Sequence, residues 1–166
     1  MKQNYVLLKT KGGKVNEVYA KLHDRDDVED ATITMGEHDI IAKLNLESDE
    51  ELYSFYKEFN SLDGVEVVNV LPSFMDKTNE ADFDDMGYEA WILVKAKGDI
   101  DTMLDKLLKI NGMAEVAAIT GEWGILAHAY DDEIEDIGMI ALKAQDIEGV
   151  DTTETLLAFP EHFARP

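Results

Sequence analysis

The sequence predicts an α+β fold made of two tandem βαββαβ units with antiparallel sheets. The main observation is an internal repeat, because Met35–Ala42 (Met-Gly-Glu-His-Asp-Ile-Ile-Ala) returns 85 positions later as Thr120–Ala127 (Thr-Gly-Glu-Trp-Gly-Ile-Leu-Ala). Each copy reads as a strand, a tight turn at a glycine and a second strand. The second observation is that strand-like and helix-like patterns alternate in the same order around both copies. A fixed offset of this kind indicates a tandem repeat.

The first copy opens with an apolar run, Tyr5–Lys9, that ends before Gly12-Gly13 and predicts a strand. A helix follows, because apolar residues then recur at the spacing of one helix face. These residues are Val15, Val18, Tyr19 and Leu22.

The central hairpin and the second half of the copy follow directly. Residues Ala31–Met35 alternate between apolar and polar and predict the second strand, and Ile40–Leu46 predicts the third. Ser48 and Glu51 have the spacing of a capping box, which opens a second helix. The buried face of that helix is predicted to hold Leu52, Phe55, Tyr56 and Phe59. A turn at Asp63-Gly64 then leads to the fourth strand, Val65–Leu71.

The second copy loses one residue near Gly98, so the offset is 86 up to this glycine and holds at 85 from there to the end. Trp91–Lys95 repeats the first strand, and Leu71–Phe74 is matched by Leu156–Phe159. Its helix faces are predicted to hold Ile100, Met103, Leu104 and Leu107 in the first helix, and Ile137, Ile140, Ala141 and Ala144 in the second. We therefore predict a first unit over residues 1–75 and a second over 89–166.

The segment between the copies is acidic and has no apolar period. We predict an acidic linker over residues 76–88 that lies outside both units. A metal-binding loop is the alternative, but the run lacks the glycine-centred spacing of oxygen ligands that a calcium loop has.

A right-handed βαβ crossover followed by a hairpin and a second helix favours the ferredoxin-like strand order 4-1-3-2, with both helices on one sheet face. In the first strand, however, both faces are apolar, with Tyr5 and Leu7 on one and Val6 and Leu8 on the other. A bare apolar face is unfavourable in water. We therefore expect the sheets to stack about 10 Å apart as in dimeric α/β-barrels, within one chain as a pseudo-dimer or between chains as a homo-oligomer.

The charge is strongly negative, with 15 basic against 36 acidic residues and a net charge of −21. Such a surface repels nucleic acid, and either solubility or a basic protein partner explains it. The absence of cysteine excludes disulfides and thiolate chemistry. We find no apolar run near the roughly 18 residues of a membrane span and no signal-peptide core, so we expect a cytoplasmic protein without membrane partners.

This βαββαβ pattern resembles the effector-binding (RAM) domain of the leucine-responsive regulator/AsnC (Lrp/AsnC) family. The resemblance rests on the opening Tyr-Val-Leu-Leu-Lys-Thr, the Met-Gly-Glu-His-Asp hairpin and the late Asp-Gly-Val, and it covers residues 4–74 and, through the repeat, 89–159. It implies transcription regulation, dimers that form through the sheets, and binding of an amino acid or related metabolite at the turns between the second and third strands. The ligand-binding residues it implies are Met35, Gly36, Glu37, His38, Asp39, Thr120, Gly121, Glu122, Trp123 and Gly124.

The chain departs from the family pattern in two ways. Because the first strand starts at residue 5, we expect this chain to lack the helix-turn-helix that usually precedes the domain. In addition, Gly124 stands where the first copy has Asp39. We therefore expect a stand-alone small-molecule-sensing module that does not bind DNA directly. It would act by association with a full-length regulator or another basic protein, and its second site is expected to be altered or lost.

Individual side chains leave alternatives open. Asp39 either binds the ammonium group of a ligand or caps the turn. His38 at the same tip is expected to be exposed and solvated. His128 shares a face with Leu126 and Tyr130, and we expect it to be buried and hydrogen-bonded, with a pocket-lining or metal-binding role as the alternative. Trp123 at a turn tip indicates a partner surface or a ligand lid.

Catalytic motifs are missing from the sequence. It has no nucleophile elbow, no phosphate loop and no Gly-x-Gly-x-x-Gly, and it has no His-x-His or His-Glu-x-x-His spacing. We therefore predict no enzyme, no catalytic residues, no cofactor and no metal. The alternatives are a small cofactor-independent or metal-assisted enzyme, or a metal-binding protein, on the same fold. A third is an assembly partner without a ligand.

Overall fold

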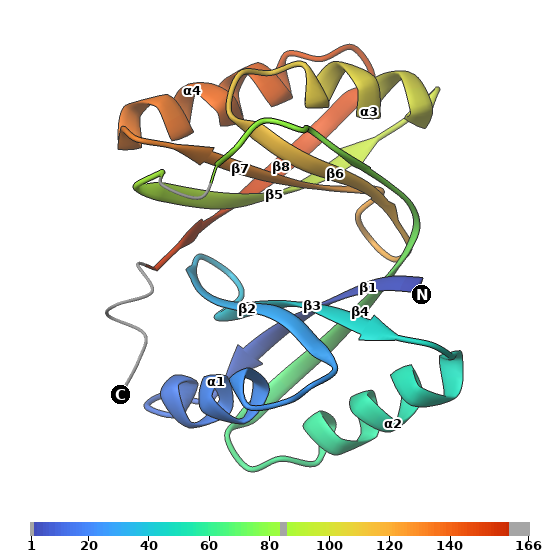
Figure 1. Cartoon of the computed structure of the whole chain (residues 1–166), viewed down its shortest axis with the longest axis vertical. Coiled ribbons are helices and arrows are strands. Elements are labelled where there is room, and N and C mark those ends of the chain that lie inside the picture. The colour runs from blue at the N-terminus through green and yellow to red at the C-terminus, as the bar shows by residue number, and fades with distance from the viewer. Residues whose placement is uncertain (1, 84–85, 160–166) are drawn as a thin grey trace. The chain divides into compact units, whose positions relative to one another are not determined.

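The computed structural model describes residues 2–83 and 86–159, which form two compact units (Figure 1). The first unit comprises the described residues up to Pro72 together with Phe159, and the second comprises Ser73–Ala158. No helix among the described residues has both the length and the apolar character needed to cross a membrane.

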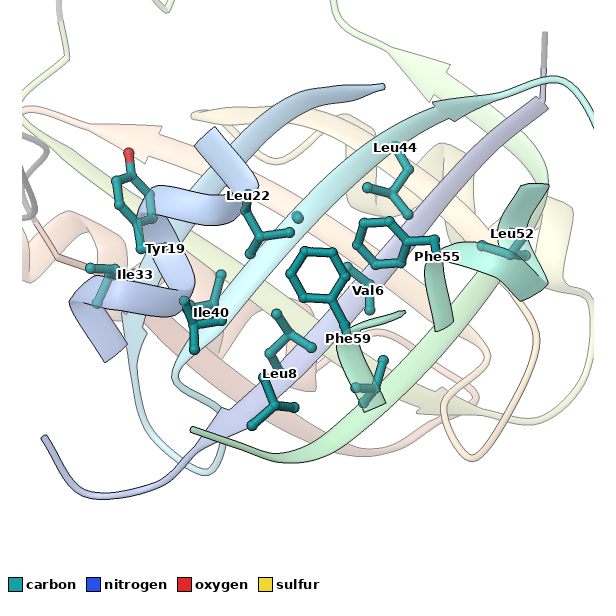
Figure 2. Packing of buried hydrophobic residues seen from close by; sticks show 14 of the residues in the cluster. Val6, Leu8, Tyr19, Leu22, Ile33, Ile40, Leu44, Leu52, Phe55 and Phe59 are labelled. Carbon is teal, nitrogen blue, oxygen red and sulfur yellow. The ribbon is translucent and has the colours of Figure 1, made fainter. Parts of the chain in front are cut away.

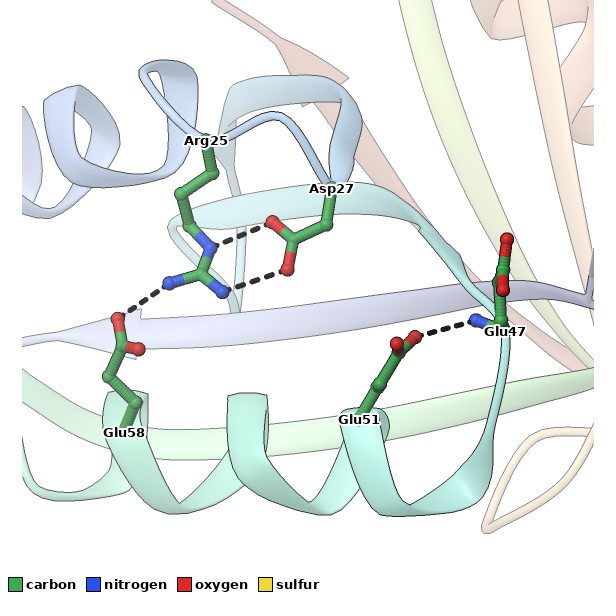
Figure 3. A network of polar contacts seen from close by, with 5 residues as sticks. All are labelled: Arg25, Asp27, Glu47, Glu51 and Glu58. Carbon is green, nitrogen blue, oxygen red and sulfur yellow. Dashed lines mark hydrogen bonds and ion pairs between the residues drawn. The ribbon is translucent and has the colours of Figure 1, made fainter.

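The first unit has the predicted element order. Its elements are β1 (Lys2–Thr10), α1 (Val15–His23), β2 (Val28–Met35), β3 (Ile40–Leu46), α2 (Asp49–Asn60) and β4 (Val65–Thr78), the last of which runs on into the second unit. The N-cap half of the predicted capping box forms, since the Ser48 hydroxyl accepts the Glu51 N–H at 3.2 Å, whereas the return bond of Glu51 goes to the residue before the N-cap. The Glu51 carboxylate accepts the N–H of Glu47 at 2.8 Å (Figure 3).

The second unit repeats this order. Its elements are β5 (Tyr88–Ala96), α3 (Ile100–Leu108), β6 (Met113–Ile119), β7 (Ile125–Asp131), α4 (Ile134–Gln145) and β8 (Val150–Ala158). In each unit both helices lie on one face of the sheet (Figure 1).

Strand pairing confirms the fold class. In the first unit β4 pairs with β1, β1 with β3, and β3 with β2, all antiparallel. In the second, β8 pairs with β5, β5 with β7, and β7 with β6. Both units therefore have the predicted order 4-1-3-2.

Equivalent backbone hydrogen bonds confirm the repeat register. The N–H of Lys11 donates to Gly64 O at 2.8 Å in the first unit, and Lys97 N–H donates to Gly149 O at 2.9 Å in the second. Both glycines have positive φ, 98° and 94°, which residues with a Cβ rarely adopt. The two turns before the last strands are thus the same structure built twice.

The core of the first unit lies between the helices and the sheet (Figure 2). The predicted faces of both helices contribute to it, and the rings of Phe55 and Phe59 stack with their centroids 4.4 Å apart. From β1 it takes Val6 and Leu8. Tyr5 and Leu7 point to the opposite face and are buried as well. The first strand is therefore buried on both faces, as its sequence requires.

The segment after Leu71 differs from the predicted linker over 76–88. β4 continues to Thr78, and its last residues pair with β6 from Ser73–Ile119 to Thr78–Glu115. Beyond the strand, Asn79 N–H donates to Ala114 O at 2.8 Å, and the Phe83 ring stacks on Tyr130 at 5.8 Å. Ladder hydrogen bonds thus hold the first part of the acidic segment against the second unit, although it lacks an apolar period.

Arg25 joins the turn after α1 to α2 (Figure 3). Its guanidinium donates two bonds to the Asp27 carboxylate, both 2.8 Å, and one to Glu58 at 2.7 Å. It also lies 5.2 Å from the ring centre of Phe55. Because the Arg25 side chain is only 27% exposed, these contacts are partly shielded from water.

We expect Arg25→Ala to lower the free energy of unfolding by about 1.5–3 kcal/mol, since charge-assisted bonds and ring contacts are lost together. Arg25→Lys should recover only part of this, because an ammonium cannot form the two parallel bonds to Asp27. Urea unfolding followed by circular dichroism measures both. Lys11→Ala, which removes a well-exposed ion pair with Asp63, is the matched control and should change stability much less. Equal losses in Arg25→Ala and Lys11→Ala would contradict this account.

Candidate functional site

The Gly36 turn joins β2 to β3 and is held by backbone hydrogen bonds at its base. Thr34 N–H donates to Asp39 O at 2.8 Å, and Asp39 N–H donates to Leu8 O, also at 2.8 Å. Gly36 has φ 139°, a value that favours glycine. The tip is therefore anchored to β1 as well as to its own hairpin.

The Asp39 carboxylate caps the end of β1. Its Oδ2 accepts the Thr10 N–H at 2.8 Å and the Thr10 hydroxyl at 3.3 Å. Asp39 thus has the capping role that the sequence analysis considered for it. Its second oxygen, Oδ1, is not buried and has no hydrogen-bond partner among the described residues. One carboxylate therefore supports the turn and still offers a free acceptor.

His38 differs from its prediction as an exposed, solvated side chain, because it is half-buried. Its Nε2 lies 3.4 Å from the Asn69 side-chain nitrogen on β4. Its Nδ1 is buried and has no hydrogen-bond partner in the described part of the chain. A buried ring nitrogen without a partner is costly, so the imidazole at this turn has an unused hydrogen-bonding position.

The other residues predicted at the first turn lie further out. Met35 is 47% exposed, and Gly36 and Glu37 are exposed. The structure thus brings His38 and Asp39 together with Thr10 and Asn69.

The equivalent turn in the second unit keeps the backbone and loses the carboxylate. Gly124 N–H donates to Val94 O at 3.1 Å, and Ile119 N–H donates to Gly124 O at 3.0 Å. Gly124 thus occupies the Asp39 position, and Ala96 occupies the position of Thr10. In the second unit, therefore, neither residue of the Asp39–Thr10 contact is kept.

A different contact forms at this second tip. The Lys95 ammonium lies 5.4 Å from the ring centre of Trp123 and 3.3 Å from the Glu122 carboxylate. Trp123 and Thr120 are half-buried, and Gly121 is exposed with φ 106°. The cation on the indole face fixes Trp123 against β5.

A buried charged cluster lies on the second sheet, on the face opposite its helices. His128 Nε2 lies 2.9 Å from the Glu89 carboxylate, and Nδ1 lies 3.3 Å from Glu115. The side chains of His128, Glu89 and Glu115 are 6%, 22% and 14% exposed. Trp91 stacks on the imidazole with 3.6 Å between ring centres, and Tyr130 is tilted against it at 4.6 Å. This confirms that His128 is buried and hydrogen-bonded.

The two carboxylates determine the charge of this imidazole. Burial favours the neutral ring, but the hydrogen bonds and charges of Glu115 and Glu89 outweigh burial and raise the pKa of His128. Burial likewise opposes the charge on Glu89, yet bonding to His128 and the Tyr130 hydroxyl lowers the pKa of Glu89 overall. Both ring nitrogens face carboxylate oxygens, and only an imidazolium can donate from both, so this geometry favours the charged ring.

This geometry does not form a metal site. Glu89 and Glu115 contact opposite nitrogens of the ring, so the three groups do not converge on one point. Within residues 2–83 and 86–159, no group of three or more His, Cys, Asp or Glu side chains is placed to share an ion.

Four residues of these sites were not predicted from the sequence: Thr10, Asn69, Glu89 and Glu115. Thr10 and Asn69 reach the Gly36 turn only through the pairing of β1 with β3 and β4. Glu89 had a usable signal, because it stands two residues before Trp91 and so shares its strand face. Glu115 had none, since a register shift between Met113 and Glu115 places it opposite His128.

Comparison with known proteins identifies the first unit. Residues 3–76 match the model of the Lrp/AsnC ligand binding domain, which confirms the resemblance for the first copy. The HTH-type transcriptional regulator FL11 of Pyrococcus furiosus is 34% identical over 62 residues, covering 37% of this chain and 41% of the regulator. An uncharacterized HTH-type regulator of Pyrococcus abyssi, PYRAB16920, is 32% identical over 79 residues, 45% of this chain and 53% of its own. The chain thus spans about half the length, or less, of these relatives.

Solved structures share the fold of nearly the whole chain. The siroheme decarboxylase NirDL matches with a TM-score of 0.72 and 10% identity, over 94% of this chain and 70% of its own. A mutant chlorite dismutase from Candidatus Nitrospira defluvii matches with a TM-score of 0.59 and 10% identity, over 99% and 95%. At this identity the likeness shows the fold alone. Both proteins are enzymes by name, so this fold also serves enzymes, and the prediction that this chain is no enzyme, drawn from missing motifs alone, does not stand.

Proposed function

We propose that residues 3–76, which carry the Lrp/AsnC ligand binding domain, sense a small metabolite with an ammonium group, such as an amino acid. The observation that carries the proposal is that two adjacent residues at the Gly36 turn each keep a polar atom without a hydrogen-bond partner among the described residues. His38 Nδ1 is buried without a partner, and the neighbouring Asp39 keeps a free carboxylate oxygen. A small-ligand site needs a few convergent polar groups on a rigid support.

The chemistry of the turn suits an amino acid. The Asp39 carboxylate would accept a charge-assisted hydrogen bond from an ammonium group. His38 Nδ1 would accept from the ligand as a neutral ring, or donate to a ligand carboxylate in its other tautomer. The backbone bonds from Thr34 and to Leu8 hold Asp39, and the Thr34 hydroxyl donates to His38 O at 2.9 Å, so the turn is ordered before the ligand arrives and the ordering cost of binding is reduced.

Ligand binding is proposed for the first unit and not for the second. The turn of the second unit has Trp123 and Gly124 in place of His38 and Asp39, and Lys95 already occupies the tip. An additional ammonium group would meet a cation there. We therefore assign effector binding to Met35, Gly36, Glu37, His38 and Asp39, and a weaker or lost site to Thr120, Gly121, Glu122, Trp123 and Gly124.

The regulatory output proposed for the chain is association with another protein. The net charge of −21 disfavours direct contact with DNA phosphates. A full-length regulator or another basic protein is the partner that this charge suits.

We expect Asp39→Asn to weaken amino-acid binding by at least tenfold while leaving the fold intact. The amide oxygen of Asn can still accept from Thr10, so the turn keeps its cap, whereas the charge that would pair with an ammonium is lost. A thermal-shift screen against the twenty amino acids selects the ligand, and calorimetry measures its affinity.

Gly124→Asp, at the repeat-equivalent position, is the matched control and should leave the affinity unchanged. Equal affinities in the wild-type protein and Asp39→Asn would show that Asp39 serves the turn alone.

A second candidate is decarboxylation of a carboxylated iron tetrapyrrole. It is favoured by the NirDL match over 94% of the chain and by His128, a buried imidazolium. In such a reaction a carbon–carbon bond breaks, CO2 leaves and a proton takes its place, so a held proton is useful. It ranks second because both nitrogens of His128 already contact carboxylates. Titration with sirohaem tests it, and an unchanged sirohaem absorption spectrum would remove this candidate.

A further inference from the structure

The outer face of α4 is apolar, unlike the same face of α2. Three large apolar side chains on it are exposed, Ile134 by 41%, Met139 by 49% and Leu142 by 53%. The repeat-equivalent residues of α2 are Asp49, Ser54 and Lys57. The buried faces of the two helices correspond, so core packing does not explain this difference.

The one large apolar side chain exposed on α2, Tyr53, is already engaged. The Lys57 ammonium lies 4.9 Å from the centre of its ring, and the Tyr56 ring stacks on it. In α4 the equivalent position is Gly138. A Cβ built there would meet nothing within 4 Å. A glycine inside a helix is less favourable than alanine, so helix stability does not explain why this exposed position is a glycine.

These residues frame a hole on the helix surface. Glu135, Gly138, Met139 and Leu142 stand at i, i+3, i+4 and i+7, which is the frame that receives one side chain of a neighbouring helix. Gly138 leaves the floor of the hole open, and Met139 adapts readily to different partners. The geometry therefore suits a helix that presents an apolar stripe.

The surrounding charge indicates what kind of helix fits. The exposed positions between 132 and 149 carry a single basic residue, Lys143. They carry six acidic residues: Asp132, Glu133, Glu135, Asp136, Asp146 and Glu148. A second copy of this chain would bring like charges together, whereas a helix flanked by Lys and Arg would pair with them.

We propose that the outer face of α4 is a docking surface for a basic amphipathic helix of another protein. This proposal rests on the proposed function in one respect: α4 would provide the surface for the protein association proposed above. It does not depend on ligand binding at the Gly36 turn. Its key residues are Ile134, Gly138, Met139 and Leu142.

The internal repeat supplies a matched variant. The triple change Ile134→Asp, Met139→Ser and Leu142→Lys installs the residues of α2 and leaves the net charge unchanged. All three positions are exposed, so the fold should be kept, and circular dichroism checks this. Tyr53→Ser on α2 is the control for removing an exposed apolar side chain elsewhere.

The probe is a synthetic 21-residue peptide with leucine at a and d positions and lysine elsewhere, and fluorescence anisotropy measures its binding to the full chain. We expect micromolar binding that the triple variant weakens by about tenfold or more and that Tyr53→Ser leaves unchanged. A scrambled peptide of the same composition should bind at least tenfold more weakly.

Equal binding of the scrambled peptide, or equal binding to the triple variant, would overturn the proposal in favour of unspecific charge attraction. If the wild-type chain self-associates with rising concentration and the triple variant does not, the partner of this surface is a second copy of the chain, and the proposal of a basic helix is overturned. Amino-acid affinity should be the same in the triple variant and the wild-type protein, so failure here is distinguishable from failure of the Gly36 site.

Discussion

Replacing His128 by leucine is expected to lower the free energy of unfolding by about 3–5 kcal/mol at pH 7, the cost of breaking a buried ion cluster on one side. The change leaves Glu89 and Glu115, which are 22% and 14% exposed, without the imidazolium between them. Urea unfolding followed by tryptophan fluorescence reports on this unit, because Trp91 and Trp123 both lie in it. The loss should shrink towards pH 5, because the two carboxyls can then take up protons.

The pH dependence of wild-type stability follows from the pKa shifts of His128 and Glu89. The pKa of His128 is raised, so above the unfolded value of about 6.5 the folded chain binds more protons than the unfolded one. The free energy of unfolding should therefore fall as pH rises from about 6.5 towards the raised pKa of His128, by at most about 1.4 kcal/mol per pH unit. The pKa of Glu89 is lowered, so its contribution is lost as pH falls below about 4.3.

Two controls separate charge pairing from packing. His23→Gln changes an exposed histidine of the first unit and should leave stability at pH 7 nearly unchanged. Adding Glu89→Gln and Glu115→Gln to His128→Leu should restore part of the loss, since no buried charge is then left unpaired. A loss below about 1 kcal/mol in His128→Leu would contradict a charged cluster.

Gly149→Ala is expected to destabilise the protein by about 2–4 kcal/mol, from positive φ and overpacking together. Gly149 has φ 94°, and a Cβ there would lie 2.7 Å from the Lys97 carbonyl oxygen. It would also lie 2.1 Å from Met103 Cε, but that side-chain end can move, whereas the carbonyl belongs to the backbone. Urea unfolding followed by circular dichroism measures the change.

The equivalent glycine of the first unit is the matched control. Gly64 has φ 98°, but its added Cβ would meet the Lys14 side chain at 3.0 Å. Gly64→Ala therefore carries mainly the cost of positive φ, about 1–2 kcal/mol. Equal losses at the two positions would show that contact with Lys97 does not contribute.

Much of the fold could be predicted because the repeat lets each copy check the other. Ile40–Leu46 is the third strand as predicted, and the predicted face of each helix packs into the core. The two apolar faces of Tyr5–Leu8 correctly indicated a strand buried on both sides. The burial of His128 followed from alternation along one strand.

The rest depends on contacts between distant segments. Ser73–Thr78 forms a strand because its backbone pairs with β6. These six residues contain no pattern from which that pairing could have been predicted. Thr10 meets Asp39 only once β1 and β3 are in register, and a register shift brings Glu115 to His128. The candidate site could be placed at the Gly36 turn from the sequence, but its supporting residues could not.

We propose that the Gly36 turn of the first unit binds an effector and that the equivalent turn of the second unit does not. The most direct test is the calorimetric stoichiometry of the amino acid that most raises the melting temperature, in the wild-type protein and in Asp39→Asn. We expect one bound molecule per chain in the wild-type protein and at least tenfold weaker binding in Asp39→Asn. Two molecules per chain with equal affinity, or an affinity unchanged by Asp39→Asn, would contradict it.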